Sequence, residues 1–294
     1  MDPLLLITNT DAGTTDAENI EKALAVLRAA TDVEVCSTGN PGELDGVLHR
    51  RGSRRVVVAG GDGSLHAVVA ALHRRQELNS AALGLIPLGT GNDFARGSDI
   101  PLDPEEAARL IVKGEVRPID LLVDCVGEIV VNNVHVGVGA EASRRSSRWK
   151  QRLGRVGYVV GAAIAAVNPP FVRLHVEVDG EQVADLAQPI LMMAIGNGPR
   201  VGGGAAITPE ADPEDGKVDV MISFAVGPLS RFAYAAHFRR GEHHARDDVL
   251  YLRGSRISVS GQGFYCSADG EVYGPERTRT WHVERGALSM ILPH

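Results

Sequence analysis

The chain has 294 residues, which is long enough for two ordinary domains. Its formal net charge of −7 argues against a general nucleic-acid binder, because such proteins need a cationic surface to neutralise phosphates. Three cysteines without a Cys-x-x-Cys pair indicate neither a disulfide framework nor a thiolate metal site, and they favour a reducing cytoplasm. No apolar run reaches the roughly 20 residues of a membrane-spanning helix, so any membrane contact is predicted to be peripheral.

The first 120 residues alternate apolar strands with amphipathic helices. Strands are predicted at residues 4–8, 33–36, 56–59 and 82–87, and helices at 16–30 and 65–75. This alternation predicts a parallel sheet in a three-layer α/β domain, whose ligand site lies at the carboxyl ends of the strands.

Residues 121–285 have a different pattern, with short β-branched runs separated by turn residues. Strands are predicted at 129–138, 172–178, 189–195, 218–224, 256–260 and 280–283, and helices at 156–167 and 229–239. We therefore predict a mainly β, β-sandwich-like second domain, and a last strand within 286–294 that returns to the first domain. With two domains, the active site is expected in the cleft between them.

Two glycine-rich segments each follow a predicted strand of the first domain. Residues 60–64 read Gly-Gly-Asp-Gly-Ser, and residues 86–96 read Ile-Pro-Leu-Gly-Thr-Gly-Asn-Asp-Phe-Ala-Arg. Glycine lets the backbone turn tightly and present successive N–H groups to a phosphate. A single cluster is also compatible with a simple strand-to-helix turn capped by Ser64. Because both loops leave the same edge of a parallel sheet, they are predicted to bind one phosphate ligand together.

Carboxylates accompany these loops. Asp62 and Asp93 lie inside them, and Asp120 follows a further apolar stretch. A carboxylate beside phosphates is suited to hold Mg²⁺, directly or through water. No Gly-x-x-x-x-Gly-Lys-Ser/Thr sequence occurs, which disfavours a common P-loop nucleotidase.

The two loops resemble the signature loops of the diacylglycerol kinase catalytic domain, which sphingosine kinases and bacterial lipid kinases share. The resemblance continues with Asn-Gly at 197–198, a Gly run at 202–204, Thr-Pro-Glu-Ala at 208–211, Asp-Gly-Lys-Val-Asp-Val at 215–220 and Asp-Gly-Glu at 269–271. These motifs occur in the family's order over nearly the full chain. The first loop departs from the family pattern, since residues 9–13 read Asn-Thr-Asp-Ala-Gly.

The resemblance implies an ATP- and Mg²⁺-dependent kinase that phosphorylates the hydroxyl of diacylglycerol or a similar lipid. It places Asp62, Asp93 and Asp120 around Mg²⁺. The residues that it places around the nucleotide are Asn9, Thr38, Gly61, Gly63, Ser64, Thr90, Gly91, Asn92 and Glu271.

The catalytic base that the resemblance implies is Asp269, with Asp62 as its rival, because a lipid hydroxyl must lose a proton to attack phosphorus. The resemblance also implies a second, structural Mg²⁺ site formed by Asp215, Asp219 and the carbonyl of Val218, helped by Lys217. A solvated Asp-Gly turn is the alternative interpretation of that segment.

Membrane contact is predicted at the inner face of the cytoplasmic membrane, through a cationic stretch around Trp149 at residues 144–155. An ordinary solvated surface is an equally good interpretation of that stretch. Two alternative functions stay open: a soluble-metabolite kinase of the NAD kinase type, and a non-catalytic lipid-binding protein. Oligomeric state is also open, and an exposed strand edge in the second domain is one route to a homodimer.

Overall fold

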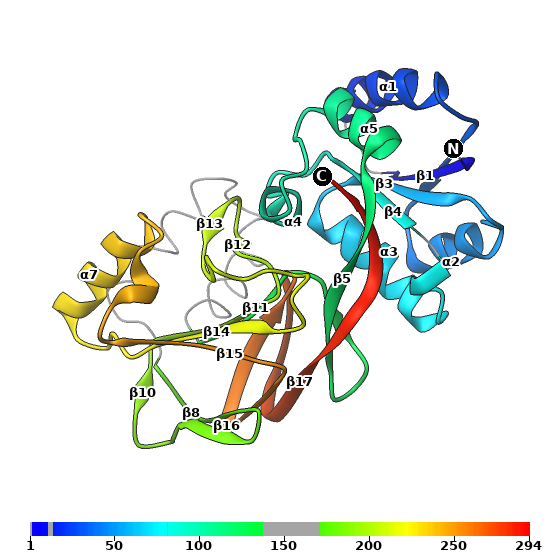
Figure 1. Ribbon diagram of the computed structural model, residues 1–294. Helices are drawn as coiled ribbons and strands as arrows, with labels where there is room; N and C mark the ends of the chain where they lie inside the picture. Colours follow the sequence, from blue (N-terminus) through cyan, green and yellow to red (C-terminus); the bar gives the residue numbers. More distant parts are fainter. Residues whose placement is uncertain (1, 11–13, 81, 138–170) are drawn as a thin grey trace. The chain divides into compact units, whose positions relative to one another are not determined.

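The computed structural model describes residues 2–10, 14–80, 82–137 and 171–294. The chain divides into two compact units (Figure 1). The first comprises Met1–Leu121, Arg200–Gly204 and Glu284–His294, and the second comprises Leu122–Pro199 and Ala205–Val283. The predicted helix at 156–167 and the cationic stretch at 144–155 lie outside the described residues.

The first unit contains a parallel sheet in the order β2–β1–β3–β4, followed by the end of β17. Its strands are β1 (Leu4–Asn9), β2 (Val33–Thr38), β3 (Arg55–Gly60), β4 (Ala82–Pro87), β12 (Arg200–Val201), the first part of β5 (Glu115–Asp124) and the last part of β17 (Glu271–Leu292). Its helices are α1 (Thr14–Arg28), α2 (Pro41–His49), α3 (Asp62–Arg74), η1 (Leu78–Ser80), α4 (Asp93–Gly97) and α5 (Pro104–Lys113).

Alternation of apolar residues gives this unit its three layers. Leu4 and Leu6 of β1 pack with Leu24 of α1 and Ile111 of α5 in one buried cluster. The intervening residues of each strand face the other side, where α3 buries its apolar residues. In Figure 1, α1 and α5 lie on one side of the sheet, and α2 and α3 lie on the other. The predicted α/β class is confirmed.

The second unit is mainly antiparallel β-structure. Its strands are β6 (Ile129–Val130), β7 (Asn133–Gly137), β8 (Val172–Val178), β9 (Glu181–Ala184), β10 (Pro189–Ile190), β11 (Met192–Gly196), β13 (Ala205–Ala206), β14 (Val218–Ser223), β15 (Val249–Gly254) and β16 (Arg256–Ala268), with the end of β5 and the beginning of β17. Its described helices are α7 (Pro228–Phe238) and η2 (His243–Ala245).

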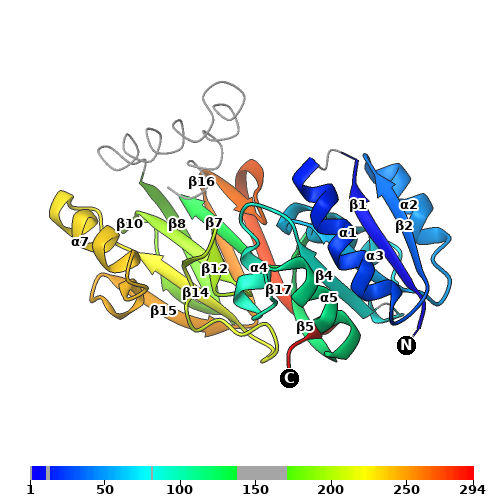
Figure 2. The same cartoon turned by 90° about the horizontal axis from the view of Figure 1, so that it is seen from above.

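Strand β16 connects two sets of strands in this unit. Its first half pairs with β8, and its second half pairs with β7 in the order β15–β14–β11–β7–β16. Between the two halves, from Ser260 to Cys266, its pairing with β17 shifts register. Figure 2 shows β7, β8 and β16 side by side. Apolar residues from both sets, such as Val134 and Val176, form one core with Trp281 of β17. The predicted β-sandwich-like architecture is confirmed.

Two strand predictions were too short. Residues 256–260 are the beginning of the longer β16, and the strands predicted at 280–283 and near the C-terminus are one strand, β17. Gly286, with φ 56°, does not end β17; its N–H donates to Oδ1 of Asp120 at 2.7 Å. None of the helices in the described part of the chain is long and apolar enough to span a bilayer.

Candidate functional site

The two glycine-rich loops of the first unit pack directly against each other. Strand β3 ends at Gly60, β4 ends at Pro87, and the N–H of Leu88 donates to the carbonyl of Gly60 at 3.0 Å. A methyl group on Gly89 would lie 2.5 Å from Cα of Gly61, which is closer than real carbon contacts allow. Glycine is therefore required where the loops touch.

Asn92 supports the second loop from inside. It is buried, adopts a left-handed conformation with φ 52°, and precedes the first residue of α4. Its Oδ1 accepts from the N–H of Gly89 at 2.9 Å, and its Nδ2 donates to the carbonyl of the same glycine at 2.8 Å. Its amide group thus holds the loop, and the predicted nucleotide contact of Asn92 stays a prediction.

Asp62 and Asp93 meet at the beginning of α4. Oδ2 of Asp62 accepts from the N–H of Asp93 at 3.1 Å, and Oδ1 accepts from the N–H of Phe94 at 3.0 Å. Asp62 therefore joins the end of the first loop to the end of the second, and it places its charge where helix N–H groups favour an anion.

Asp93 is held in turn by a distant glycine segment. Its Oδ1 accepts from the N–H groups of Gly203 and Gly204 at 2.9 and 2.7 Å. Burial raises the pKa of Asp93 above its usual range, and the nearby charge of Asp62 acts in the same direction, while the glycine N–H groups oppose both effects. The sequence contained the run at 202–204, but its contact with Asp93 could not be predicted.

The two carboxylates converge on Gly91. A methyl group there would lie 3.0 Å from Oδ2 of Asp62 and 3.3 Å from Oδ2 of Asp93. Two neighbouring carboxylate oxygens fit a divalent cation of the Mg²⁺ type, which also keeps several waters. Among the described residues, no group of three or more His, Cys, Asp or Glu side chains is arranged to hold a metal ion. The third predicted carboxylate, Asp120, is buried in β5 and accepts from the N–H of Gly286.

The other predicted nucleotide residues of the first unit lie at the carboxyl ends of its strands. Asn9 and Thr38 are the last residues of β1 and β2 and are partners in the parallel register. Gly63 and Ser64 are in the first turn of α3, and Thr90 is in the loop after β4. These positions are at the edge of the sheet where the glycine loops emerge.

Asp269 lies in the second unit, in the turn between β16 and β17. Its left-handed backbone, with φ 47°, fits the turn. Its carboxylate accepts three backbone N–H groups, those of Val131, Asn132 and Asn133, at 2.6, 2.9 and 3.1 Å. The carboxylate is therefore held in one orientation. Glu271 follows as the first, exposed residue of β17.

The predicted second metal site contains an arginine. Oδ1 of Asp219 accepts from Nε of Arg253 at 3.0 Å, and Asp215 pairs with the same guanidinium. Burial raises the pKa of Asp219 to about 6. Val218, which lies between Asp215 and Asp219 in the sequence, is the first residue of β14, and Lys217 is exposed. A metal ion bound here would compete with Arg253, so this site stays a prediction.

The structure also contains a buried ion pair that sequence analysis missed. Nε of Arg279 donates to Oδ2 of Asp124 at 2.9 Å, and both side chains are almost fully buried. The two residues are 155 positions apart, so no local sequence signal connects them.

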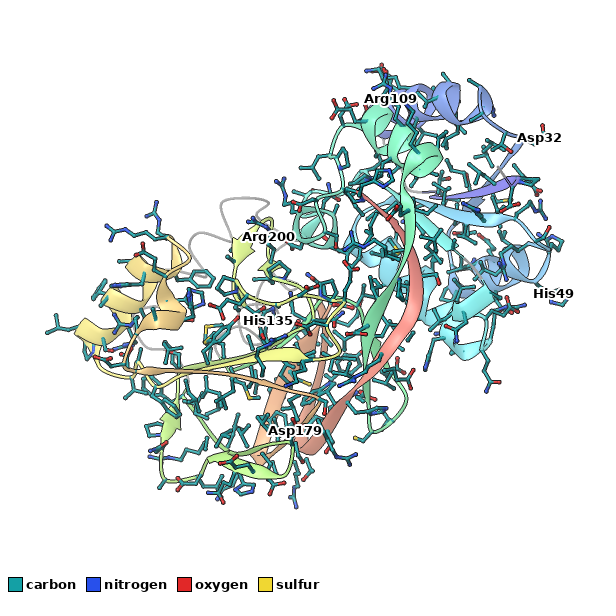
Figure 3. All side chains as sticks on the ribbon, in the orientation of Figure 1. Asp32, His49, Arg109, His135, Asp179 and Arg200 are labelled. Carbon is teal, nitrogen blue, oxygen red and sulfur yellow. The ribbon has the colours of Figure 1, made fainter. Side chains whose placement is uncertain are left out.

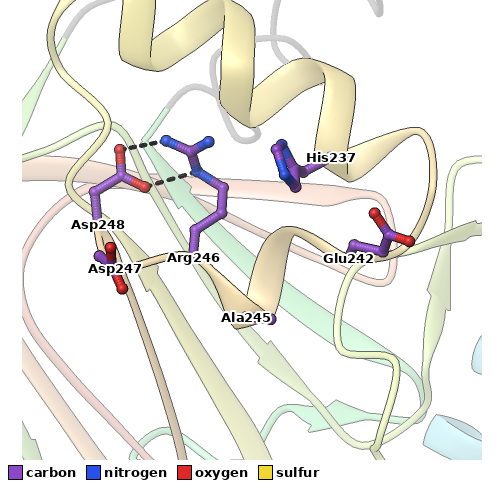
Figure 4. Close-up of a pocket in the computed structure, with 6 residues that line it drawn as sticks. All are labelled: His237, Glu242, Ala245, Arg246, Asp247 and Asp248. Carbon is purple, nitrogen blue, oxygen red and sulfur yellow. Dashed lines mark hydrogen bonds and ion pairs between the residues drawn. The ribbon is translucent and has the colours of Figure 1, made fainter.

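Two open pockets lie outside the glycine loops. One, of about 450 Å³, lies in the first unit and is lined by Ala95, Arg96, Asp99, Ile100, Leu102, Arg200, Gly203 and Gly204. The other, of about 640 Å³, lies in the second unit beside α7. Figure 4 shows it with the ion pair of Arg246 and Asp248 in its wall. None of the predicted site residues lines either pocket.

Two family models match the chain. Residues 3–123 match the "Diacylglycerol kinase catalytic domain". Residues 132–292 match the "YegS C-terminal NAD kinase beta sandwich-like domain". Together the two models cover most of both units.

Curated relatives and solved structures agree with these matches. A "Probable lipid kinase YegS-like" from Xanthomonas campestris is 34% identical, covering 95% of this chain and 93% of the relative. One of the same name from Pseudomonas aeruginosa is 32% identical, covering 99% and 94%. A solved structure described as a diacylglycerol kinase from Bacillus anthracis superposes with a TM-score of 0.79 over 99% of this chain and 97% of that one, at 24% identity, which supports the fold.

Proposed function

Because the chain belongs to the lipid kinase family that carries a diacylglycerol kinase catalytic domain, we propose that it transfers the γ-phosphoryl group of ATP to the hydroxyl of diacylglycerol or a similar lipid alcohol. The product would be phosphatidic acid or an analogous phospholipid. The observation that carries the proposal is the convergence of Asp62 and Asp93 on Gly91, at the junction of two packed glycine loops.

Phosphoryl transfer depends mainly on positioning and on neutralising charge. In the proposed mechanism, backbone N–H groups at the first turn of α3 and in the loop after β4 bind the phosphates. Asp62 and Asp93 would hold Mg²⁺, and Asp120 would be a third carboxylate that helps to organise the ion and its waters. When bound, Mg²⁺ neutralises charge on the phosphoryl oxygens.

Asp269 is the proposed base that takes the proton of the lipid hydroxyl. Three backbone N–H groups hold its carboxylate in one orientation, so its position does not have to change when the acceptor hydroxyl binds. Asp62 is the less suitable base, since its Oδ2 lies with Oδ2 of Asp93 beside Gly91, where the proposed Mg²⁺ would occupy it. We assign Asp62 to the metal and to the loops.

The substrate requires the enzyme to work at a membrane, and we propose peripheral contact at the inner face of the cytoplasmic membrane. Leu229 and Phe232 on α7 support this proposal, because they are 85% and 73% exposed. They lie one turn apart, and Arg239 and Arg240 follow the helix. An apolar face with cations at its end suits an interfacial helix.

A panel of lipids tests the proposal. Purified protein would be incubated with radiolabelled ATP, Mg²⁺ and mixed micelles that contain diacylglycerol, ceramide, sphingosine, undecaprenol or phosphatidylglycerol. Labelling of one lipid, and its loss when EDTA removes Mg²⁺, is the expected result. Label that appears only on NAD, or on nothing, would reject it.

A further inference from the structure

The second unit buries a histidine that the proposed mechanism does not use. His135, labelled in Figure 3, lies in the middle of β7 and is 7% exposed. Its register partner on β16 is Ser267, which is 1% exposed. Among the described residues, neither ring nitrogen of His135 nor Oγ of Ser267 has a hydrogen-bond partner. Buried polar groups are nearly always paired, so neighbouring unpaired groups require a physical explanation.

These two side chains face away from the core of the unit. Val134 and Val136, which flank His135 in β7, belong to the buried core. Because successive side chains of a strand point to opposite faces, His135 points to the other face. Ser267 is opposite His135, so both lie on that face.

The same face has a polar end and an apolar end. Ser267 lies two residues before Asp269, and the Asp269 carboxylate acts electrostatically on His135. Across the sheet, the residue opposite His135 on β11 is Ala194, and the residue opposite Ala194 on β14 is Met221. The sulfur of Met221 lies 3.8 Å from the hydroxyl of Tyr234, in the apolar surroundings of α7.

This order matches the chemistry of a lipid alcohol. Burial lowers the pKa of His135 to about 4, so the ring is neutral at pH 7 and provides one donor and one acceptor. A serine hydroxyl also provides both. Hydroxyl and ester groups have the complementary atoms, whereas an anionic phosphate would require a cation.

We infer that His135 and Ser267 form the subsite that binds the neutral polar group of the lipid acceptor, with its apolar part directed along the face toward Ala194 and Met221. This inference rests on the proposed function and deepens it. It assigns to His135 the positioning of the acceptor beside Asp269, and it defines the acceptor as a lipid with an uncharged hydroxyl or ester head.

The subsite predicts opposite effects on stability and on binding. In His135→Leu the unpaired polar atoms are gone, so the free protein should melt at the same temperature or about 2–4 °C higher. The KM for 1,2-dioctanoylglycerol should rise about 10-fold or more, because the hydrogen bonds to the acceptor are lost. The KM for ATP should not change.

Conservative variants separate binding from packing. His135→Gln keeps a donor and an acceptor, so it should restore part of the acceptor affinity. Ser267→Ala should raise the acceptor KM by about 3- to 10-fold without lowering the melting temperature.

His243 is a matched control in the same unit. It is fully buried, but its Nε2 donates to the carbonyl of Ile207 at 2.9 Å. Its Nδ1 has no partner among the described residues, but His243→Leu still removes the donor to Ile207, so its melting temperature should fall while its KM for dioctanoylglycerol stays that of the wild type.

The outcomes distinguish this inference from the proposed function. If wild-type protein labels no lipid, the proposed function and this inference fail together. If wild-type protein labels dioctanoylglycerol, but His135→Leu keeps the wild-type KM or melts earlier as His243→Leu does, the subsite is wrong and the lipid kinase proposal stands.

Discussion

The contact between the two glycine loops can be tested by adding single methyl groups. In Gly89→Ala, the new carbon would lie 2.5 Å from Cα of Gly61 and 2.8 Å from Oδ1 of Asn92. One of these neighbours is backbone, so the loops must move apart. Overpacking of this kind costs about 1–3 kcal/mol. We expect a loss of about 2 kcal/mol, which lowers the melting temperature by about 4–8 °C.

Gly63→Ala is the matched comparison. A methyl group there meets no atom of residues 2–10, 14–80, 82–137 or 171–294 within 4 Å, and the position lies in the first turn of α3. Alanine in a helix is about 0.5–1 kcal/mol more stable than glycine, so the protein should not lose stability. Its affinity for a non-hydrolysable ATP analogue with Mg²⁺ should nevertheless fall about 10-fold or more, if a phosphate occupies the open space beside Gly63.

Calorimetric melting and isothermal titration with the analogue measure both effects. We expect Gly89→Ala to lose stability and affinity, and Gly63→Ala to lose affinity alone. Unchanged affinity in Gly63→Ala, or unchanged stability in Gly89→Ala, would refute the reasoning about the joined loops.

Three further predictions concern the second unit. Arg279→Met leaves the buried carboxylate of Asp124 unpaired, so unfolding in urea should show a loss of about 3–5 kcal/mol, and a loss below 1 kcal/mol would contradict the buried pair. The pKa of His135 is about 4 in the folded protein and 6.5 in the unfolded chain, so between these pH values the unfolded state binds more protons. The free energy of unfolding should therefore fall by about 3 kcal/mol from pH 6.5 to pH 4. This pH-dependent loss should be absent in His135→Leu. Replacing Leu229 and Phe232 by serine should reduce flotation with anionic vesicles about 100-fold without changing the melting temperature, and equal flotation would exclude α7 from membrane contact.

The architecture could be predicted because local patterns determine it. Apolar runs such as Leu4–Asn9 and the helices between them indicate a parallel sheet wherever they occur. The two glycine loops were visible as short motifs, and parallel order was enough to expect that they meet. The ends of the strands were less predictable. A glycine often marks the end of a strand, but Gly286 lies inside β17 and its N–H donates to Asp120.

The details of the site depend on tertiary contacts that a sequence does not display. Asp93 is held by Gly203 and Gly204, more than 100 positions away. His135 sits in a run of apolar residues that predicts a buried strand, and only the structure shows that its ring has no hydrogen-bond partner in the part of the chain that is described. The cleft predicted between the two domains, the second metal site and the homodimer stay predictions.

Transfer of labelled phosphate from ATP to the lipid that the wild-type protein phosphorylates tests the proposed catalytic assignment most directly. We predict that Asp269→Ala abolishes turnover while its affinity for Mg²⁺-ATP stays close to that of the wild type, because Asp269 acts on the acceptor hydroxyl and not on the nucleotide. Normal turnover in Asp269→Ala would contradict this assignment and make Asp62 the preferred base.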